Sequence, residues 1–99
     1  EYALARKYLK GCSGVFCFGV KGGVAAGERV MNSLKVAAIA VHVADLRTCV
    51  LHPASMTHRQ LSESELIAAG VSPDMIRVSV GLEHIDDLIA DFDQALAQA

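Results

Sequence analysis

The sequence MIRVSVGLEH, residues 75–84, has the alternating pattern of a strand followed by the start of a helix. Successive side chains of a strand point to opposite faces, so the apolar residues of this stretch share one face: Ile76, Val78 and Val80. Arg77 falls on the other face, with the small residues Ser79 and Gly81 beside it. A guanidinium is always charged, and an arginine at a sheet surface therefore needs an anionic partner.

Two kinds of partner for Arg77 are open from the residues alone. One is an aspartate or glutamate of the same chain, which would make the arginine part of an internal ion pair. The other is the carboxylate of a bound ligand, because the planar fork of arginine donors holds a carboxylate through two hydrogen bonds. The small residues Ser79 and Gly81 leave room for such a ligand.

The rest of the chain alternates helical and extended patterns. Apolar periodicity predicts helices at about 3–10, 24–36, 63–69 and 85–96, of which the first and third end at a glycine. Short apolar runs predict strands at 14–21, 37–43, 48–51 and 75–80. Ser62 and Glu65 have the spacing of a capping box, which predicts that a helix starts there. Together these elements predict one domain over 1–99 of the α/β or α+β class, with a small three- to four-stranded sheet and helices packed on one face.

Two elements carry clear predictions about burial. The strand at 14–21 has apolar side chains on both faces, which predicts that both faces are covered. One stripe of the last helix is apolar and is expected to be buried: Ile85, Leu88, Ile89, Phe92, Ala95 and Leu96. The aspartates of this helix mostly fall outside the stripe and are expected to face solvent: Asp86, Asp87, Asp91 and Asp93.

The composition is more apolar than a domain of this size requires. Hydrophobic residues make up 53% of the 99 residues, whereas so short a chain buries only about 60–65% of the surface of its unfolded form. The longest apolar run, 36–44, is interrupted by His42 and is shorter than the ~18–20 residues of a membrane-spanning helix. The excess therefore indicates a surface that faces another domain or subunit. A net charge of −2 argues against a nucleic-acid surface.

Cysteine and histidine usage argues against a metal site. The cysteines are odd in number and have no C-x-x-C spacing, which suits buried, inert thiols in a reducing cytoplasm: Cys12, Cys17 and Cys49. His52 and His58 flank a segment broken by proline, so their geometry does not suit a shared metal ion. His42 lies in an apolar run and is expected to be a core histidine with satisfied hydrogen bonds.

Three stretches, in this order and spacing, resemble the C-terminal domain of the Cys/Met-metabolism family of pyridoxal-phosphate (PLP) enzymes: FGVKGG (18–23), HPASMTH (52–58) and IRVSVGLEHIDDLIADFDQAL (76–96). The resemblance covers nearly the whole chain and implies the C-terminal domain of a fold-type I PLP enzyme. Its closest likeness is to O-acetylhomoserine sulfhydrylases, aminocarboxypropyltransferases that exchange the γ-substituent of an activated homoserine ester for a sulfur nucleophile. A γ-lyase or a cystathionine γ-synthase of the same family is the alternative chemistry. An alternative of another class is a free-standing domain that binds an amino acid or mediates dimerisation.

The resemblance also assigns roles to individual residues. Arg77 matches the family's arginine that holds the substrate α-carboxylate, and His42-Val43-Ala44-Asp45 matches a loop that helps to orient the same carboxylate. In this loop His42 stands where the family usually has asparagine or serine, and Ala44 stands where it has glycine. The resemblance thus implies three substrate-binding residues: Arg77, His42 and Val43. Two more are expected to support the site without touching the substrate: Thr57 and Ser79.

The family's cofactor is PLP, and the resemblance implies that a large domain absent from this chain binds it. The family's Schiff-base lysine and phosphate-gripping residues match no motif here, so no catalytic, cofactor-binding or metal-binding residue is expected, and the chain alone is expected to be inactive. The implied partners are an amino-acid substrate with a free α-carboxylate, the large domain and further copies in a homodimer or homotetramer, but neither nucleic acid nor a membrane. Because the sequence begins at Glu1 without Met, it is expected to be the C-terminal part of a longer cytoplasmic protein.

Overall fold

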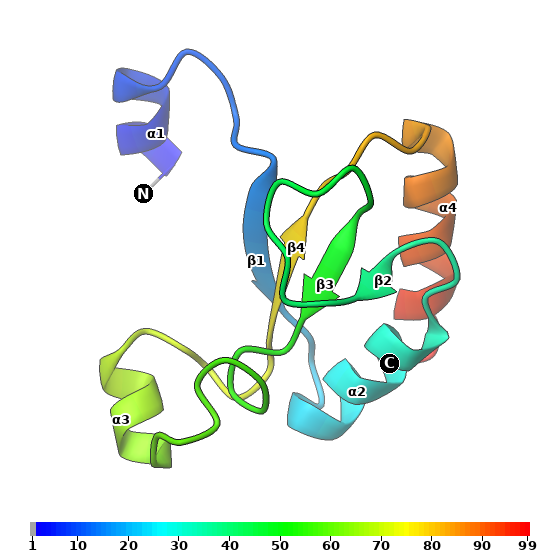
Figure 1. Ribbon diagram of the computed structural model, residues 1–99. Coiled ribbons are helices and arrows are strands. Elements are labelled where there is room, and N and C mark those ends of the chain that lie inside the picture. Colours follow the sequence, from blue (N-terminus) through cyan, green and yellow to red (C-terminus); the bar gives the residue numbers. More distant parts are fainter. Residues whose placement is uncertain (1) are drawn as a thin grey trace.

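A four-stranded mixed sheet lies at the centre of the computed structural model, which describes residues 2–99 (Figure 1). Its strands are β1 (Val15–Gly19), β2 (Ala38–Ile39), β3 (Cys49–Leu51) and β4 (Met75–Ser79). Their order across the sheet is β1-β4-β3-β2. Strand β4 pairs antiparallel with both β1 and β3, whereas β2 pairs parallel with β3. The strand that carries Arg77 is therefore central in the sheet.

Two of the four helices cover one face of this sheet. The helices are α1 (Tyr2–Tyr8), α2 (Gly23–Ser33), α3 (Glu63–Ala68) and α4 (Ile85–Leu96). Helices α2 and α4 pack against each other beside the sheet, while α1 and α3 stand apart from that layer (Figure 1). The predicted class is confirmed: a mixed α/β domain with four strands and a helical layer on one face.

The hydrophobic core lies between the sheet and the two packed helices. Side chains from both layers form one buried cluster: Val20, Ala26, Val30, Met31, Ala37, Val50, Ile76, Val78 and Ala95. Leu88 and Ala95 of α4 are buried, as the sequence predicts. Ile85 and Ile89 belong to the predicted buried stripe, but each is 59% exposed. The rest of this chain thus covers only part of the apolar stripe of α4, and Ile85 and Ile89 lie outside the covered part.

Asp91 contradicts the prediction that the aspartates of α4 face solvent. Its side chain is buried, and its carboxylate accepts hydrogen bonds from the backbone N–H groups of Lys35 at 2.8 Å and of Val36 and Ala37 at 2.9 Å. These three N–H groups follow α2 and need acceptors once they are buried. Burial raises the pKa of Asp91, but the three donors outweigh it and hold this pKa below its usual value. The carboxylate thereby joins α4 to the end of α2.

Two predicted strands are shorter or more exposed than expected. The apolar run at 37–43 pairs with β3 only at Ala38–Ile39, after which the chain leaves the sheet. Val41 and Val43 are consequently more than half exposed. Strand β1 lies at the other edge of the sheet, and its Phe16 and Cys17 are exposed. The prediction that both faces of β1 are covered is therefore wrong for this chain.

The start of α3 follows the capping-box prediction. The backbone N–H of Ser62 donates to Oε2 of Glu65 at 2.7 Å, and the hydroxyl oxygen of Ser62 accepts from the backbone N–H of Glu65 at 3.4 Å. The bond from the Ser62 backbone holds the pKa of Glu65 below its usual value. Gly70, with φ +78°, follows the end of the helix in the left-handed conformation typical of a glycine there.

Much apolar surface lies outside the core. Helix α1 has no buried residue, and its Tyr2 and Tyr8 are exposed. The cysteines also differ in burial. Cys49 is buried, as expected. Cys12 and Cys17 are exposed, which contradicts the prediction that they are buried. None of the helices described within 2–99 is long and apolar enough to cross a bilayer.

Candidate functional site

Arg77 lies in the middle of β4, on the face of the sheet that points away from α2 and α4. Its neighbours in register are Cys17 of β1 and Leu51 of β3. Its Nη2 donates a hydrogen bond to the carbonyl oxygen of Val41 at 3.2 Å. The Nε atom is buried and has no hydrogen-bond partner among the described residues.

An internal ion pair, one of the two partners open from the sequence, does not form in residues 2–99. The ion pairs among these residues are Arg47 with Asp45 at 3.6 Å and His84 with Asp86 at 3.8 Å. A buried donor without an acceptor costs about 1–3 kcal/mol, and such groups are rare in folded proteins. Arg77 therefore keeps donor capacity that suits a carboxylate from outside the described residues.

The backbone at 41–44 lies next to Arg77 and is hydrogen-bonded to the same strand. The hydroxyl oxygen of Ser79, which is buried, accepts from the backbone N–H of Ala44 at 3.1 Å. Ala44 has φ 59° and is the single non-glycine residue with positive φ in the described part of the chain. The position that matches a family glycine thus keeps a backbone conformation that favours glycine. The structure brings Arg77, Ser79 and this backbone together.

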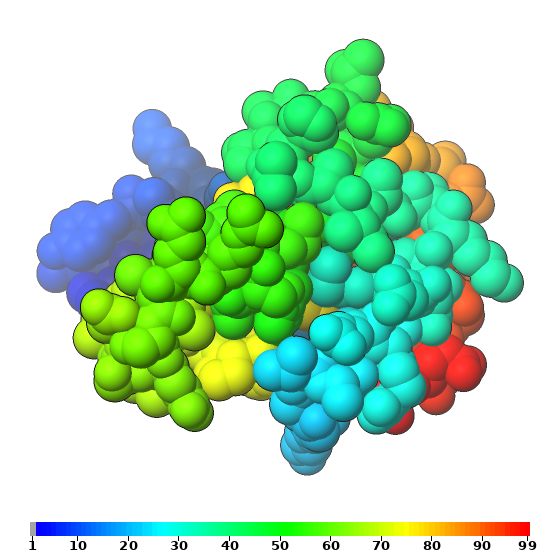
Figure 2. Space-filling model, turned by 60° about the horizontal axis from the view of Figure 1, so that its bottom comes forward, coloured from blue at the N-terminus to red at the C-terminus, as the bar shows by residue number. Residues whose placement is uncertain are grey.

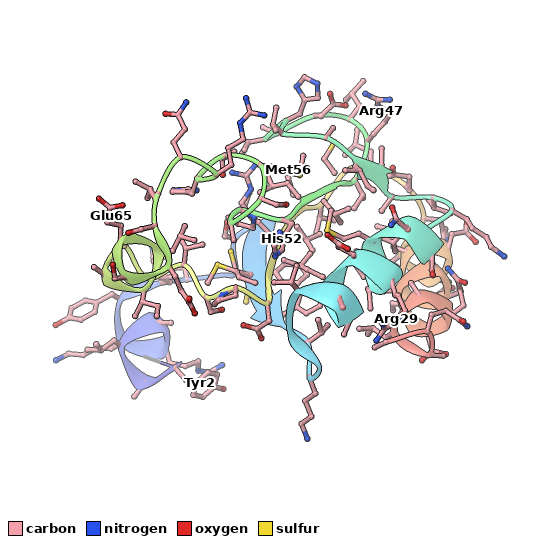
Figure 3. All side chains as sticks on the ribbon, turned by 90° about the horizontal axis from the view of Figure 1, so that it is seen from below. Tyr2, Arg29, Arg47, His52, Met56 and Glu65 are labelled. Carbon is pink, nitrogen blue, oxygen red and sulfur yellow. The ribbon has the colours of Figure 1, made fainter. Side chains whose placement is uncertain are left out.

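The side chains of His42 and Val43 point to solvent rather than into the core. Both residues are exposed, so the expectation of a core histidine at position 42 is wrong. The chain has already left the sheet at this point, since β2 ends at Ile39. Both side chains remain accessible to a substrate or to another part of the protein. Figure 3 shows Arg47 at the outer end of the same loop, away from α3.

Thr57 and His52 lie in the turn-rich segment that follows β3. Thr57 is exposed, and its hydroxyl lies 2.8 Å from Nδ1 of His58; no hydrogen bond joins the Thr57 side chain to Arg77 or to 41–44 within the described residues. His52 is buried, and its Nε2 donates to the Pro73 carbonyl at 2.6 Å while its Nδ1 lies 2.7 Å from the Ser55 hydroxyl (Figure 3). His52 is thus the satisfied buried histidine of this chain. The described residues contain no cluster suited to a metal ion.

Sequence reasoning missed Glu83 as part of this region. One carboxylate oxygen of Glu83 accepts from the backbone N–H of Thr48 at 2.7 Å, and the other accepts from the Thr48 hydroxyl at 2.8 Å. The backbone bond from Thr48 holds the pKa of Glu83 below its usual value. Thr48 and Glu83 are 35 residues apart in the sequence, so no local sequence pattern predicts this contact.

The residues of this chain do not fit the cofactor that the resemblance implies. PLP enzymes bind the cofactor through a lysine amine in an enclosed site. The lysines described here are all exposed on the surface: Lys7, Lys10, Lys21 and Lys35. Cofactor chemistry is therefore not assigned to these residues.

The chain is similar to known enzymes. Over 94 residues the chain is 52% identical to O-acetyl-L-homoserine sulfhydrylase 1 of Thermus thermophilus, with 94% of this chain and 22% of that protein covered. It is 46% identical to the L-methionine gamma-lyase of Treponema denticola over 97% of this chain and 24% of the relative. The chain thus spans about a quarter of the length of these curated relatives.

A solved structure has the same fold. A Campylobacter jejuni protein assigned as an O-acetylhomoserine (thiol)-lyase, crystallised with N′-pyridoxyl-lysine-5′-monophosphate, superposes with a TM-score of 0.88 at 39% identity. The match covers 97% of this chain and 23% of that one. Residues 1–97 also match the family described as "Cys/Met metabolism PLP-dependent enzyme". The chain therefore belongs to this family of PLP-dependent enzymes.

Proposed function

We propose that this chain is the substrate-orienting C-terminal domain of a PLP-dependent sulfhydrylase of methionine and cysteine metabolism. The substrate is O-acetylhomoserine or a related homoserine ester, and the parent protein is an aminocarboxypropyltransferase. The similarity to a sulfhydrylase over nearly the whole chain supports this activity. The similarity to a methionine gamma-lyase supports the alternative of γ-elimination within the same family.

The observation that carries the proposal is the state of Arg77. Its guanidinium has five N–H donors, of which one makes a hydrogen bond in the described structure, to Val41. No carboxylate of residues 2–99 forms an ion pair with it. An α-carboxylate is the anionic group that every amino-acid substrate carries, and it matches the fork of the guanidinium.

The contribution of this chain is binding geometry. A carboxylate held by Arg77 on a central strand has little freedom to rotate, so the reactive end of the substrate points in one direction. His42 and Val43 are exposed and follow Val41 in the chain, so both can contact the same substrate. Ser79 supports the loop because its hydroxyl oxygen accepts from the Ala44 N–H. Thr57 is assigned a supporting role by resemblance. PLP, held by a large domain of the same protein, supplies an electron sink for the reaction.

Exposed apolar surface supports an assembly larger than this chain. One apolar hollow of about 230 Å³ lies between the sheet and α4 and includes Phe16, Val80, Ile85 and Ile89 in its lining. Such surfaces commonly mark contacts with other domains or subunits. We extend the proposal to packing against the large domain and to a homodimer or homotetramer in the cytoplasm.

The test uses Arg77→Ala and Arg77→Lys in the complete enzyme. Loss of a charge-assisted bidentate contact is expected to lower kcat/KM by about 10²-fold or more, with the melting temperature little changed. Lysine should restore part of the activity, since an ammonium keeps the charge and lacks the fork. Wild-type kcat/KM in a folded Arg77→Ala enzyme would refute the proposal that this chain orients the substrate through Arg77.

A further inference from the structure

Strand β4 and the segment that follows it form hydrogen bonds to the 41–48 loop at positions 77, 79, 81 and 83. Arg77 and Ser79 bond to the backbone of this loop near its start, as described above. The backbone N–H of Gly81 donates to the Thr48 hydroxyl at 2.9 Å, and Glu83 accepts two hydrogen bonds from Thr48. Positions 77 and 79 share one side of β4, and the contact continues at Gly81 and Glu83 in the segment that follows the strand. Together they fix the loop at both of its ends.

Gly81 shows how closely the two segments approach. A Cβ atom at position 81 would lie 2.4 Å from the carbonyl oxygen of Leu46 and 2.5 Å from the backbone nitrogen of Thr48. The neighbouring N–H of Leu82 donates to the same Leu46 carbonyl at 2.8 Å. The end of the loop is therefore pressed against the chain that follows β4, and a side chain at position 81 would separate them.

Glu83 is the charged member of this contact. Both of its carboxylate oxygens bond to Thr48, which is completely buried. Hydrogen bonds to an ionised acceptor are shorter and stronger than neutral ones. The Thr48 hydroxyl donates to Glu83 and accepts from Gly81, so the threonine is fixed from two directions. Without Glu83, Thr48 would lose the acceptor of a buried N–H group.

The start of the loop needs this support because its backbone is strained. Ala44 adopts a left-handed conformation that L-residues other than glycine rarely adopt. Such conformations persist only where the surrounding structure holds them. Two hydrogen bonds hold this end: the Ala44 N–H donates to the Ser79 hydroxyl oxygen, and Nη2 of Arg77 donates to the Val41 carbonyl.

We infer that Glu83 is a positioning residue for the substrate carboxylate. It anchors Thr48, Thr48 fixes the end of the 41–48 loop, and the loop presents the Val41 carbonyl that orients the Arg77 guanidinium. Glu83 acts through the loop and does not touch the substrate. This inference rests on the proposed role of Arg77 in binding that carboxylate.

The test compares Glu83→Ala, Glu83→Gln and the control Glu28→Ala in the complete enzyme. Glu28 is exposed on α2 and makes no side-chain hydrogen bond within the described residues. Glu83→Ala should raise KM for the amino-acid substrate about 10-fold and change kcat by less than about threefold, because binding geometry is lost while the chemistry is kept. Glu83→Gln should recover most of the affinity, since its amide can accept from the Thr48 N–H and donate to the Thr48 hydroxyl. Glu28→Ala should match the wild type.

Amide hydrogen exchange gives a second readout of the same link. The Ala44 and Thr48 amides should exchange faster in Glu83→Ala than in Glu28→Ala, because the loop opens more often. If Glu83→Ala does not fold, Thr48→Val removes the hydroxyl at nearly constant volume, and the same rise in KM is expected of it.

Each outcome of these measurements decides the role of Glu83. A KM within about twofold of the wild type in folded Glu83→Ala overturns the inference. A KM in Glu83→Gln as high as that in Glu83→Ala overturns it as well. These results leave the proposed function standing if Arg77→Ala still impairs binding. A normal KM in Arg77→Ala would instead refute the proposed function, on which the role of Glu83 depends.

Discussion

The two faces of the sheet are closed in different ways. On one face α2 and α4 cover the strands with apolar side chains, and Asp91 joins the two helical segments from within. On the other face the 41–48 loop lies against β4 and its continuation through hydrogen bonds to Ser79, Gly81 and Glu83 (Figure 1). In the space-filling view residues 41–48 lie in the green part of the surface at the top (Figure 2). The first face provides stability, whereas on the second face the buried Nε of Arg77 has no hydrogen-bond partner among the described residues.

The largest effect on stability is expected on the helical side, at Asp91. Asp91→Ala removes the acceptor of three backbone N–H groups at 35–37 and should lower the free energy of unfolding by about 2–4 kcal/mol. Asp93, two residues later and exposed, is the matched control, and Asp93→Ala should change stability by less than about 0.5 kcal/mol. Urea unfolding followed by circular dichroism measures both. Equal losses would show that the carboxylate of Asp91 has no special role.

The same carboxylate predicts a pH dependence of stability. The pKa of Asp91 is lower in the folded state than the value of about 3.9 in an unfolded chain, so its stabilisation is fully present above the unfolded pKa and is lost as the pH falls through the folded pKa. Asp91→Asn cannot titrate and lacks this contribution. The difference in unfolding free energy between wild type and Asp91→Asn should therefore be constant from about pH 7 to 5 and shrink below about pH 4. A constant difference down to pH 2 would contradict the role of the ionised carboxylate.

Patterns within single segments predicted the positions of the helices well. The positions of α2 and α4 follow from apolar spacing. Helix α3 starts at a capping box, which the spacing of Ser62 and Glu65 is sufficient to predict. The burial of Leu88 also follows from this spacing. In each case the partners lie within a few residues of one another, or burial depends on side-chain polarity alone.

The predictions failed where a polar group finds its partner far away in the sequence. The helical pattern predicts that Asp91 faces solvent, but in the fold the N–H groups at 35–37 lie beside it and donate to its carboxylate. Glu83 and Thr48 meet across 35 positions, and neither residue type marks the contact. The run at 37–43 is apolar enough for a strand, but β2 has only β3 as a neighbour and ends at Ile39. Arg77 stands out in the sequence because a charge at a sheet surface requires a partner.

The smallest effect is expected at Ala44, on the side of the 41–48 loop. A left-handed conformation costs a residue with a Cβ about 1–2 kcal/mol, while glycine adds about 0.4–1 kcal/mol of conformational entropy to the unfolded state. Ala44→Gly should therefore leave stability unchanged or raise it by up to about 1 kcal/mol. At the buried Ala26 of α2, the matched alanine on the helical side, glycine should instead destabilise by about 1 kcal/mol.

Thermal and urea unfolding of both glycine variants measures this contrast. A loss of more than about 1 kcal/mol in Ala44→Gly would mean that the methyl group of Ala44 contributes packing that outweighs its strain. A gain at Ala44 together with a loss at Ala26 would show that the loop, unlike the helical layer, retains backbone strain. Because Ala44 stands where the resemblance places a glycine, that gain would also identify alanine at this position as a substitution tolerated at a cost in stability, with the Ser79 hydroxyl holding the strained backbone in place.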